Sequence, residues 1–480
     1  MPAKKRSRGR GPSLETATPA VTPDAEGMFD PGGLPSGPTG RYLVVLRDVG
    51  QAALIKTLKN SAGLNARTTA DFESAAVTAK DLNEADAMIF EHLGVAVVNA
   101  DPRQRLSLES VVADNTNPVL AVEPEEYVFA LAEEDGGPIV SAAGLSYLRG
   151  YQDAVNALVA GLAGAPAEVA EEEAGVAATY ADTAKLTWGL QATLAARSLC
   201  SGRGIRVAVL DTGMDVAHPD FAGRSPITAS FVPGQPVQDG HGHGTHCIGT
   251  SCGPKAPAGT TRRYGIATGA TILAGKVLSN AGSGQDSWIL AGINWAIQNR
   301  AVVISMSLGA PVAVGQGFKL AYEQAAQAAL NAGALIVAAA GNSGNQPVGS
   351  PANCPSIMAV AAVDSNLQRA AFSCIGLNPN GGEVDIAGPG VAVFSSTKMP
   401  TRYATWSGTS MATPHVAGCA ALWAENTGKR GKPLWNQLVS AARNIGLPAQ
   451  QAGAGLVQAP SCRRVIVPKP IPRPLLPIPR

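Results

Sequence analysis

Short runs of apolar residues alternate with helical patterns between residues 185 and 460. Five runs are predicted to be strands, over residues 205–210, 271–277, 301–306, 334–340 and 357–363. Helices are predicted between them, over residues 286–298 and 318–331. Because strands that are apolar on both faces and alternate with helices indicate a parallel sheet covered on both sides, we predict an α/β fold, a three-layer sandwich with a mostly parallel sheet.

A smaller unit precedes it, over residues 41–131. Its pattern predicts a strand at 42–46, a helix at 51–60, a β segment across 88–99 with a turn near Gly94, a helix from Asp101 toward Asp114, and a strand at 119–131. This order is typical of a ferredoxin-like α+β sandwich. The small unit is therefore predicted to fold as a domain in front of the larger one.

The remaining segments have the composition of tails and linkers. Residues 1–40 are rich in Pro and Gly, begin with a basic cluster and are expected to be disordered. Residues 132–184 carry an amphipathic helical pattern at 145–162 and an acidic, Ala-rich run at 168–173, which is typical of an exposed linker. Residues 461–480 form a Pro-rich basic tail.

Composition excludes some functions. The 37 Lys and Arg residues balance 36 Asp and Glu residues, so nothing points to nucleic acid. No apolar run approaches the ~18 residues of a membrane span. The basic N-terminus lacks the apolar segment of a Sec signal peptide, and seven cysteines are not a disulfide framework. Together these favour a reducing compartment, with the protein cytoplasmic or exported by a non-Sec route.

Asp211 directly follows the first predicted strand, in Asp211-Thr212-Gly213. The same triplet occurs in aspartic proteases, which need two such aspartates that share a proton. The chain has no second Asp-Thr-Gly or Asp-Ser-Gly, and a parallel α/β pattern does not suit that class. We therefore expect Asp211 to lie at the carboxyl edge of the sheet, where ligands bind in such folds.

His243 lies in His241-Gly242-His243-Gly244-Thr245-His246-Cys247. Three histidines and a cysteine suggest a zinc site, but neither a carboxylate nor a Cys pair stands at ligand spacing. The alternative is a general base at the start of a helix, with glycines that allow close packing around the imidazole.

Two further polar residues follow Gly-rich turns. Asn342 ends the predicted strand at 334–340, where it could supply an amide donor or only form a turn. Ser410 opens a helical pattern in Gly408-Thr409-Ser410-Met411-Ala412-Thr413-Pro414-His415. Its hydroxyl would project from the turn beside a free backbone N–H and the positive end of the helix dipole, which suits a nucleophile that generates an oxyanion. An ordinary serine N-cap is the alternative.

Taken together, these motifs resemble the subtilisin-like serine proteases, the subtilase family. The order Asp211, His243, Ser410 is the subtilisin order, and Asn342 stands in the family's Ala-Gly-Asn motif. The resemblance covers about residues 185–460. It is closest to the proteinase K-like branch, because Cys247 follows His246.

The resemblance implies a serine endopeptidase that works through an acyl-enzyme. Ser410 would be the nucleophile, His243 the general base, Asp211 the residue that orients the imidazole, and Asn342 an oxyanion donor. No cofactor is required for this chemistry. Peptide cyclisation or transpeptidation on the same triad, and a non-catalytic scaffold that retains the fold, are the alternatives.

The resemblance also implies partners and ligands. Protein or peptide substrates would pair with the edge segment Gly282, Ser283, Gly284 and enter a broad, apolar-tolerant pocket with walls at Ser307, Leu308, Gly309 and at Ala339, Ala340, Gly341. A structural calcium site would use Pro355, Ile357 and Asp385. Residues 41–131 resemble the family's inhibitory propeptide, notably at 119–125, which implies an autoinhibited zymogen with an intramolecular inhibitor.

Overall fold

A seven-stranded parallel sheet lies at the centre of the computed structural model, which describes residues 37–47, 51–72, 77, 79–112, 114, 117–131, 133–134 and 179–462. Every neighbouring pair of its strands is parallel, as predicted. In spatial order the strands are β15 (Ile386–Pro389), β14 (Met358–Val363), β13 (Leu335–Ala339), β11 (Val303–Met306), β7 (Arg206–Asp211), β9 (Thr271–Lys276) and β8 (Ile227–Ser230).

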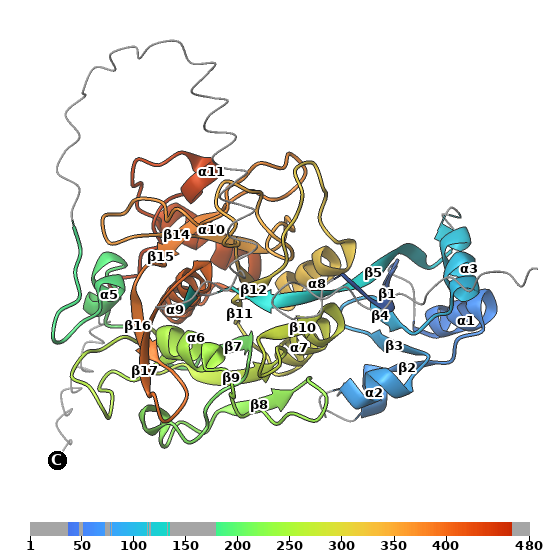
Figure 1. The fold of residues 1–480 in the computed structure, drawn as a ribbon, viewed down its shortest axis with the longest axis horizontal. Helices are drawn as coiled ribbons and strands as arrows, with labels where there is room; N and C mark the ends of the chain where they lie inside the picture. The colour runs from blue at the N-terminus through green and yellow to red at the C-terminus, as the bar shows by residue number, and fades with distance from the viewer. Residues whose placement is uncertain are drawn as a thin grey trace, which may run out of the picture.

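Helices cover both faces of this sheet (Figure 1). Alternate residues of β7 separate the two layers: Ala208 and Leu210 belong to one hydrophobic cluster, Val207 and Val209 to the other. The first cluster includes α7 (Asp286–Gln298) and α8 (Leu320–Asn331), and the second includes α6 (His243–Cys252), α9 (Thr409–Thr427) and α10 (Gly431–Ala441). The three-layer α/β prediction is confirmed.

Smaller elements complete this part of the chain. They are α5 (Trp188–Ala192), α11 (Ala449–Ala452) and the antiparallel pair β16 (Val393–Ser396) and β17 (Tyr403–Ser407). No helix in the described part of the chain is long and apolar enough to cross a membrane.

The N-terminal part is a ferredoxin-like sandwich with the order β5-β1-β4-β3-β2. The predicted β segment at 88–99 is a hairpin that turns at 91–94. The first strand begins at Pro38, inside the tail that was predicted to be disordered. The elements are β1 (Pro38–Leu46), α1 (Gln51–Ala62), β2 (Ala66–Thr68), α2 (Ala79–Glu84), β3 (Ala87–Phe90), β4 (Val95–Val98), α3 (Pro102–Val112) and β5 (Val119–Ala130).

The two faces of this small sheet have different neighbours. One face, with Val44 and Leu46, packs with α1 and α3 in a core of its own. The other face, with Leu43 and Val45, shares its hydrophobic cluster with α7 and α8 of the large sandwich. Figure 1 shows the N-terminal elements, in blue, on this side of the molecule. The small sheet is therefore held between its own helices and α7 and α8.

Strand β5 joins the two parts directly. Its C-terminal half pairs antiparallel with β10 (Ser283–Gln285) and with β12 (Leu308–Gly309). Beyond it, β6 (Glu133–Glu134) pairs with β17. The helix predicted at 145–162 and the acidic run at 168–173 lie outside the described residues.

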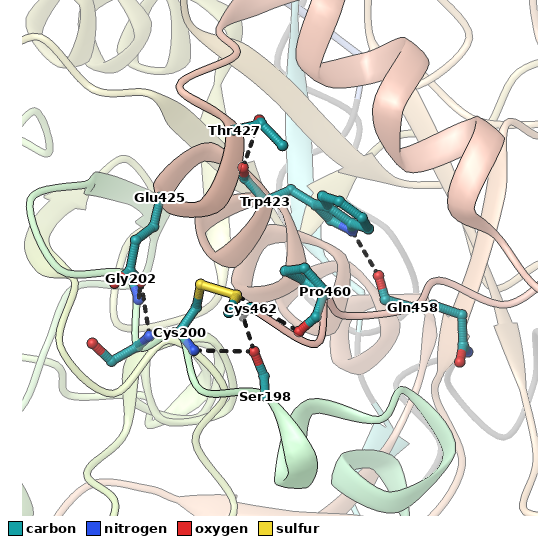
Figure 2. Close-up of a disulfide and its surroundings, with 10 residues drawn as sticks. Ser198, Cys200, Gly202, Trp423, Glu425, Thr427, Gln458, Pro460 and Cys462 are labelled. Atoms are coloured by element: carbon teal, nitrogen blue, oxygen red, sulfur yellow. Dashed lines mark hydrogen bonds between the residues drawn. A yellow bond between two sulfur atoms is a disulfide. The ribbon is translucent and has the colours of Figure 1, made fainter. Parts of the chain in front are cut away.

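A disulfide that the sequence analysis did not predict joins Cys200 to Cys462 (Figure 2). The chain around it lies against the C-terminal end of α9, where the Glu425 carboxylate accepts hydrogen bonds from the backbone N–H groups of Ser201 (2.8 Å) and Gly202 (2.5 Å). The other five cysteines are buried and free. Disulfides of this kind persist in oxidising compartments, so the bond argues against the reducing compartment that the cysteine count favoured, and the compartment stays a prediction.

We expect Cys200→Ser to destabilise the fold. The bond spans 262 residues of sequence, and closing so long a loop restricts the unfolded chain, so the free energy of unfolding should fall by about 3–5 kcal/mol. Thermal unfolding with and without a reductant measures this. Reduction should lower the midpoint of the wild type to that of the variant and leave the variant unchanged; equal midpoints throughout would contradict the expectation.

Candidate active site

Strand β7 ends at Asp211, a fully buried carboxylate at the carboxyl edge of the sheet. Its Oδ1 accepts hydrogen bonds from the backbone N–H of Thr212 (2.7 Å) and from Nδ1 of His243 (2.7 Å). The next turn requires glycine at position 213. Its φ is 105°, and a Cβ added there would lie only 2.1 Å from the carbonyl oxygen of Val237. The Asp-Thr-Gly triplet thus brings a carboxylate to the first turn of α6.

His243 is the first residue of α6 and is fully buried. Its ring stacks at 6.3 Å on Trp406, and its Nε2 has no hydrogen-bond partner among the described residues. Burial disfavours the imidazolium, but the charge of Asp211 and its hydrogen bond outweigh this and raise the pKa of His243 well above its usual value. A base that must hold a transferred proton needs this stabilisation.

Cys247 lies one helical turn after His243, with its Sγ 4.0 Å from the imidazole Nδ1. Burial raises the pKa of its thiol, which favours the neutral form of the side chain. The thiol also donates to the backbone carbonyl of Ser410 at 3.6 Å. Cys247 therefore joins the helix that carries His243 to the helix that carries Ser410.

Ser410 lies in the first turn of α9, after Gly408 and Thr409, and is fully buried. Its hydroxyl donates to the carbonyl oxygen of Ser307 at 3.0 Å, and its own carbonyl accepts from the Ser307 hydroxyl at 2.9 Å. In this conformation the hydroxyl is thus bonded to Ser307 and not to His243.

Asn342 follows β13 and faces the chain after β5. Its Nδ2 donates to the carbonyl oxygen of Leu131 at 2.9 Å. Its Oδ1 accepts from the backbone N–H (3.0 Å) and the hydroxyl (2.8 Å) of Thr409, which fixes the orientation of the amide. The side-chain amide of Asn342 is therefore held in an orientation in which it donates to one peptide carbonyl of the same chain, that of Leu131.

The predicted substrate segments flank residues 127–131. Residues 283–285 pair with residues 127–129 on one side, and Leu308 and Gly309 pair with Ala130 and Phe129 on the other. The N–H of Ala130 donates to the Gly282 carbonyl at 2.9 Å, and that of Leu131 reaches the Ser307 carbonyl at 3.4 Å. The Leu131 side chain lies against Gly309, where an added Cβ would be 3.2 Å from its Cδ1.

Two of the predicted pocket residues, Ala340 and Gly341, also form backbone hydrogen bonds that shape this edge of the sheet. Ala340 pairs through its N–H with the Val360 carbonyl at the sheet edge, and the N–H of Gly341 donates to the Thr409 hydroxyl at 3.2 Å. They carry the turn that positions Asn342. Thr409 itself was missed by the sequence analysis, although it stands beside Ser410.

The three histidines and the cysteine of the histidine-rich motif do not come together in one cluster of ligand atoms. Within the described residues, the one group of ligand atoms close enough to hold a metal is that of Asp211, His243 and Cys247. His246 instead stacks on Trp406 at 4.7 Å and bonds through Nε2 to the Val393 carbonyl at 3.1 Å. Burial lowers the pKa of His246 to about 3, so it is a neutral structural residue.

The predicted calcium ligands lie at the ends of two neighbouring strands. Ile357 is buried in the turn before β14, two residues after Pro355, and Asp385 precedes β15. One oxygen of Asp385 accepts from the N–H of Ala359 at 2.8 Å. Burial raises the pKa of Asp385 to about 7, although the Ala359 N–H and the charge of Lys432 act in the opposite direction, so a bound cation would stabilise its ionised form.

Comparisons with known proteins agree with this geometry. A family model described as the subtilase family matches residues 202–455. Subtilisin NAT of Bacillus subtilis subsp. natto is 45% identical over 228 residues, which are 46% of this chain and 56% of the relative. Subtilisin Savinase of Lederbergia lenta is 42% identical over 287 residues, 58% of this chain and 98% of the relative.

An alkaline protease of Shouchella clausii is also 42% identical over 287 residues, 58% of this chain and 70% of the relative. The match to several subtilisins thus spans only a little over half of their length, 56%, while that to Savinase spans nearly all of it. The family model covers all strands of the parallel sheet and the residues Asp211, His243, Asn342 and Ser410. The chain belongs to the subtilase family.

Proposed function

We propose that this chain is a serine endopeptidase, made as a zymogen that residues 41–131 inhibit. One observation carries the proposal: the Leu131 carbonyl lies on the Asn342 amide, between two strands that pair with residues 127–130. An extended peptide held by its backbone, with one carbonyl on a fixed donor, is the arrangement that acyl transfer requires. The relatives' names, subtilisin and alkaline protease, support the same activity.

In the proposed reaction Ser410 Oγ leaves the Ser307 carbonyl and attacks the peptide carbonyl. Its proton passes to Nε2 of His243, while Asp211 stabilises the imidazolium through Nδ1. The oxyanion accepts hydrogen bonds from Asn342 Nδ2 and from the N–H of Ser410. Collapse breaks the C–N bond, the leaving amine takes the proton from His243, and water hydrolyses the resulting ester by the same steps.

Asp385, with the carbonyl oxygens of Pro355 and Ile357, is proposed to hold a structural calcium ion away from this chemistry. Carboxylate and backbone oxygens are the ligands that calcium prefers. The ion would stabilise the ends of β14 and β15. The proteinase K-like branch also stays a prediction, which rests on Cys247.

The zymogen proposal rests on the buried contacts of residues 41–131. Glu125 is fully buried, forms a two-pronged ion pair with Arg41 (2.7 and 3.0 Å) and accepts from the N–H of Ser287 in the first turn of α7 (2.9 Å). Glu123 accepts from the N–H groups of Leu320 (2.8 Å) and Ala321 (3.0 Å) at the start of α8. Both carboxylates meet the positive end of a helix, which favours this docked position.

The domain limits are part of the same proposal: an inhibitory domain at 41–131, a linker at 132–184 and a catalytic domain at 185–460. The peptide bond after Leu131 follows the carbonyl that Asn342 binds. It is therefore the bond that we expect the enzyme to cut first in its own chain.

The first prediction concerns the nucleophile. Ser410→Ala should abolish hydrolysis of casein and labelling by a fluorophosphonate, because the attacking oxygen is absent. The exposed Ser440→Ala variant serves as the matched control and should keep both. Labelling of Ser410→Ala at the wild-type level would contradict the mechanism, and an unlabelled wild type would favour the scaffold alternative.

The second prediction concerns processing. N-terminal sequencing of the larger processed fragment should begin at Ala132, and Leu131→Asp should slow this cleavage, since a charge would replace the apolar side chain against Gly309. Residues 37–131 added in trans should inhibit the processed enzyme at submicromolar concentration. A first cut elsewhere, or no inhibition at micromolar concentration, would show that residues 127–131 do not act as the inhibitor.

The third prediction concerns calcium. Millimolar Ca²⁺ should raise the thermal midpoint of the wild type and leave that of Asp385→Asn unchanged, because the variant lacks the charged ligand. Differential scanning fluorimetry with Mg²⁺ as the control ion measures this. An equal shift in both proteins would place any bound calcium elsewhere.

A further inference from the structure

Asp239 is a buried carboxylate, 2% exposed, four residues before His243 and outside all the roles assigned so far. Five donors converge on it. Its Oδ1 accepts from the Thr212 hydroxyl (2.9 Å) and from the N–H groups of His241 (3.0 Å) and Gly242 (2.7 Å). Its Oδ2 accepts from the N–H (2.9 Å) and the hydroxyl (2.7 Å) of Thr245.

These bonds join the two elements that carry Asp211 and His243. The first N–H groups of a helix have no partner within it. In α6 that of Gly244 donates to the Thr212 hydroxyl at 2.8 Å, and that of Thr245 donates to Asp239. Since the N–H of Thr212 in turn bonds to Asp211 Oδ1, one carboxylate fastens the start of α6 to the turn after β7.

The backbones of these two elements touch. A Cβ on Gly244 would lie 2.2 Å from the Gly213 carbonyl oxygen, so the first turn of α6 rests on the turn after Asp211 without an intervening side chain. Since no side chain between these two backbones can adjust, a change in the hydrogen bonds that cap α6 would move the His243 imidazole directly.

A buried cation balances the charge. Lys276, on β9, is fully buried, and its ammonium donates to the Thr212 carbonyl (2.5 Å) and to Asn280 Oδ1 (2.9 Å). The same Asn280 oxygen accepts from the N–H of Gly240 at 3.1 Å. Two carboxylates this close would be costly to bury without a counter-charge, and Lys276 supplies it from the neighbouring strand.

We propose that Asp239 is a positioning residue for acyl transfer. It keeps the His243 imidazole hydrogen-bonded to Asp211 and in the position where it can accept the proton of Ser410. It touches neither substrate nor reacting atoms and acts through Thr212 and the first turn of α6. The inference rests on the proposed peptidase function.

Asp239→Asn tests this proposal. The amide has the size of the carboxylate, but its NH₂ group would face N–H and hydroxyl donors that bond to a carboxylate oxygen in the wild type. The expected result is a fall in kcat of about 10²-fold with KM within about twofold, since the imidazole moves while the substrate strands stay in place. The proton on His243 Nδ1 gives an NMR resonance far downfield when bonded to a carboxylate, and in the variant this resonance should shift upfield.

Asp220→Asn is the matched control. Asp220 is similarly buried, at 5% exposure, and accepts from the hydroxyls of Tyr264 (2.5 Å) and Tyr403 (3.0 Å) and from the N–H of Ala258 (2.7 Å). None of these donors belongs to α6 or to the turn after Asp211. This variant should lose stability but keep the kcat of the folded enzyme and the Nδ1 resonance.

Thr212→Val and Thr212→Ser carry the test if Asp239→Asn does not fold. Valine removes the hydroxyl that links Asp239 to Gly244 and should lower kcat and shift the resonance, and serine should restore both. If Asp239→Asn or Thr212→Val loses stability yet keeps the wild-type kcat and resonance, Asp239 is only structural and the inference is wrong. A wild type without peptidase activity would refute the proposed function, while the resonance would still report on Asp239.

Discussion

The hydrogen bond of 2.7 Å between Asp211 and His243 is the constraint on which the rest of the site depends. Both side chains are fully buried, and a lone carboxylate or imidazolium would be costly there, so each needs the other. The close glycine turns, the capping of α6 and the buried Lys276 all serve to keep these two groups at this distance. Ser410 lies on a different helix, α9, where its backbone carbonyl accepts hydrogen bonds from the side chains of Cys247 and Ser307.

Much of the fold could be predicted because the signal was local. Strands that are apolar on both faces, such as 205–210 and 357–363, identified the parallel sheet, and its carboxyl edge then brought Asp211 and Asn342 to one place. The order β-α-β-α-β likewise identified the ferredoxin-like sandwich, since period and turn residues alone set those elements.

The features that could not be predicted depend on contacts between distant residues. The Cys200–Cys462 bond leaves no trace in spacing. The sequence analysis did not single out Asp239, because the bond that ties it to the turn after Asp211 comes from Thr212, in a distant segment. The Thr409–Asn342 bonds depend on how β13 and α9 meet. Sequence patterns give the elements, while such bonds follow only from their packing.

The pairing of β5 with β10 and β12 places one segment of the chain beside Asn342 through backbone hydrogen bonds. Main-chain bonds place residues 127–130, so position is set by extended geometry and only Leu131 and its neighbours add side-chain selectivity. Glu125 and Glu123, which accept hydrogen bonds from N–H groups in the first turns of α7 and α8, then hold the small sandwich against these helices.

The disulfide has a further consequence for the peptidase that we propose. Residues 200 and 462 bracket the whole parallel sandwich, with their Cα atoms 5.7 Å apart. The sandwich is thus a closed covalent ring. Cleavage of one peptide bond in a surface loop between these residues would open the ring but release no fragment. The same cleavage in a chain without the disulfide would give two separate pieces.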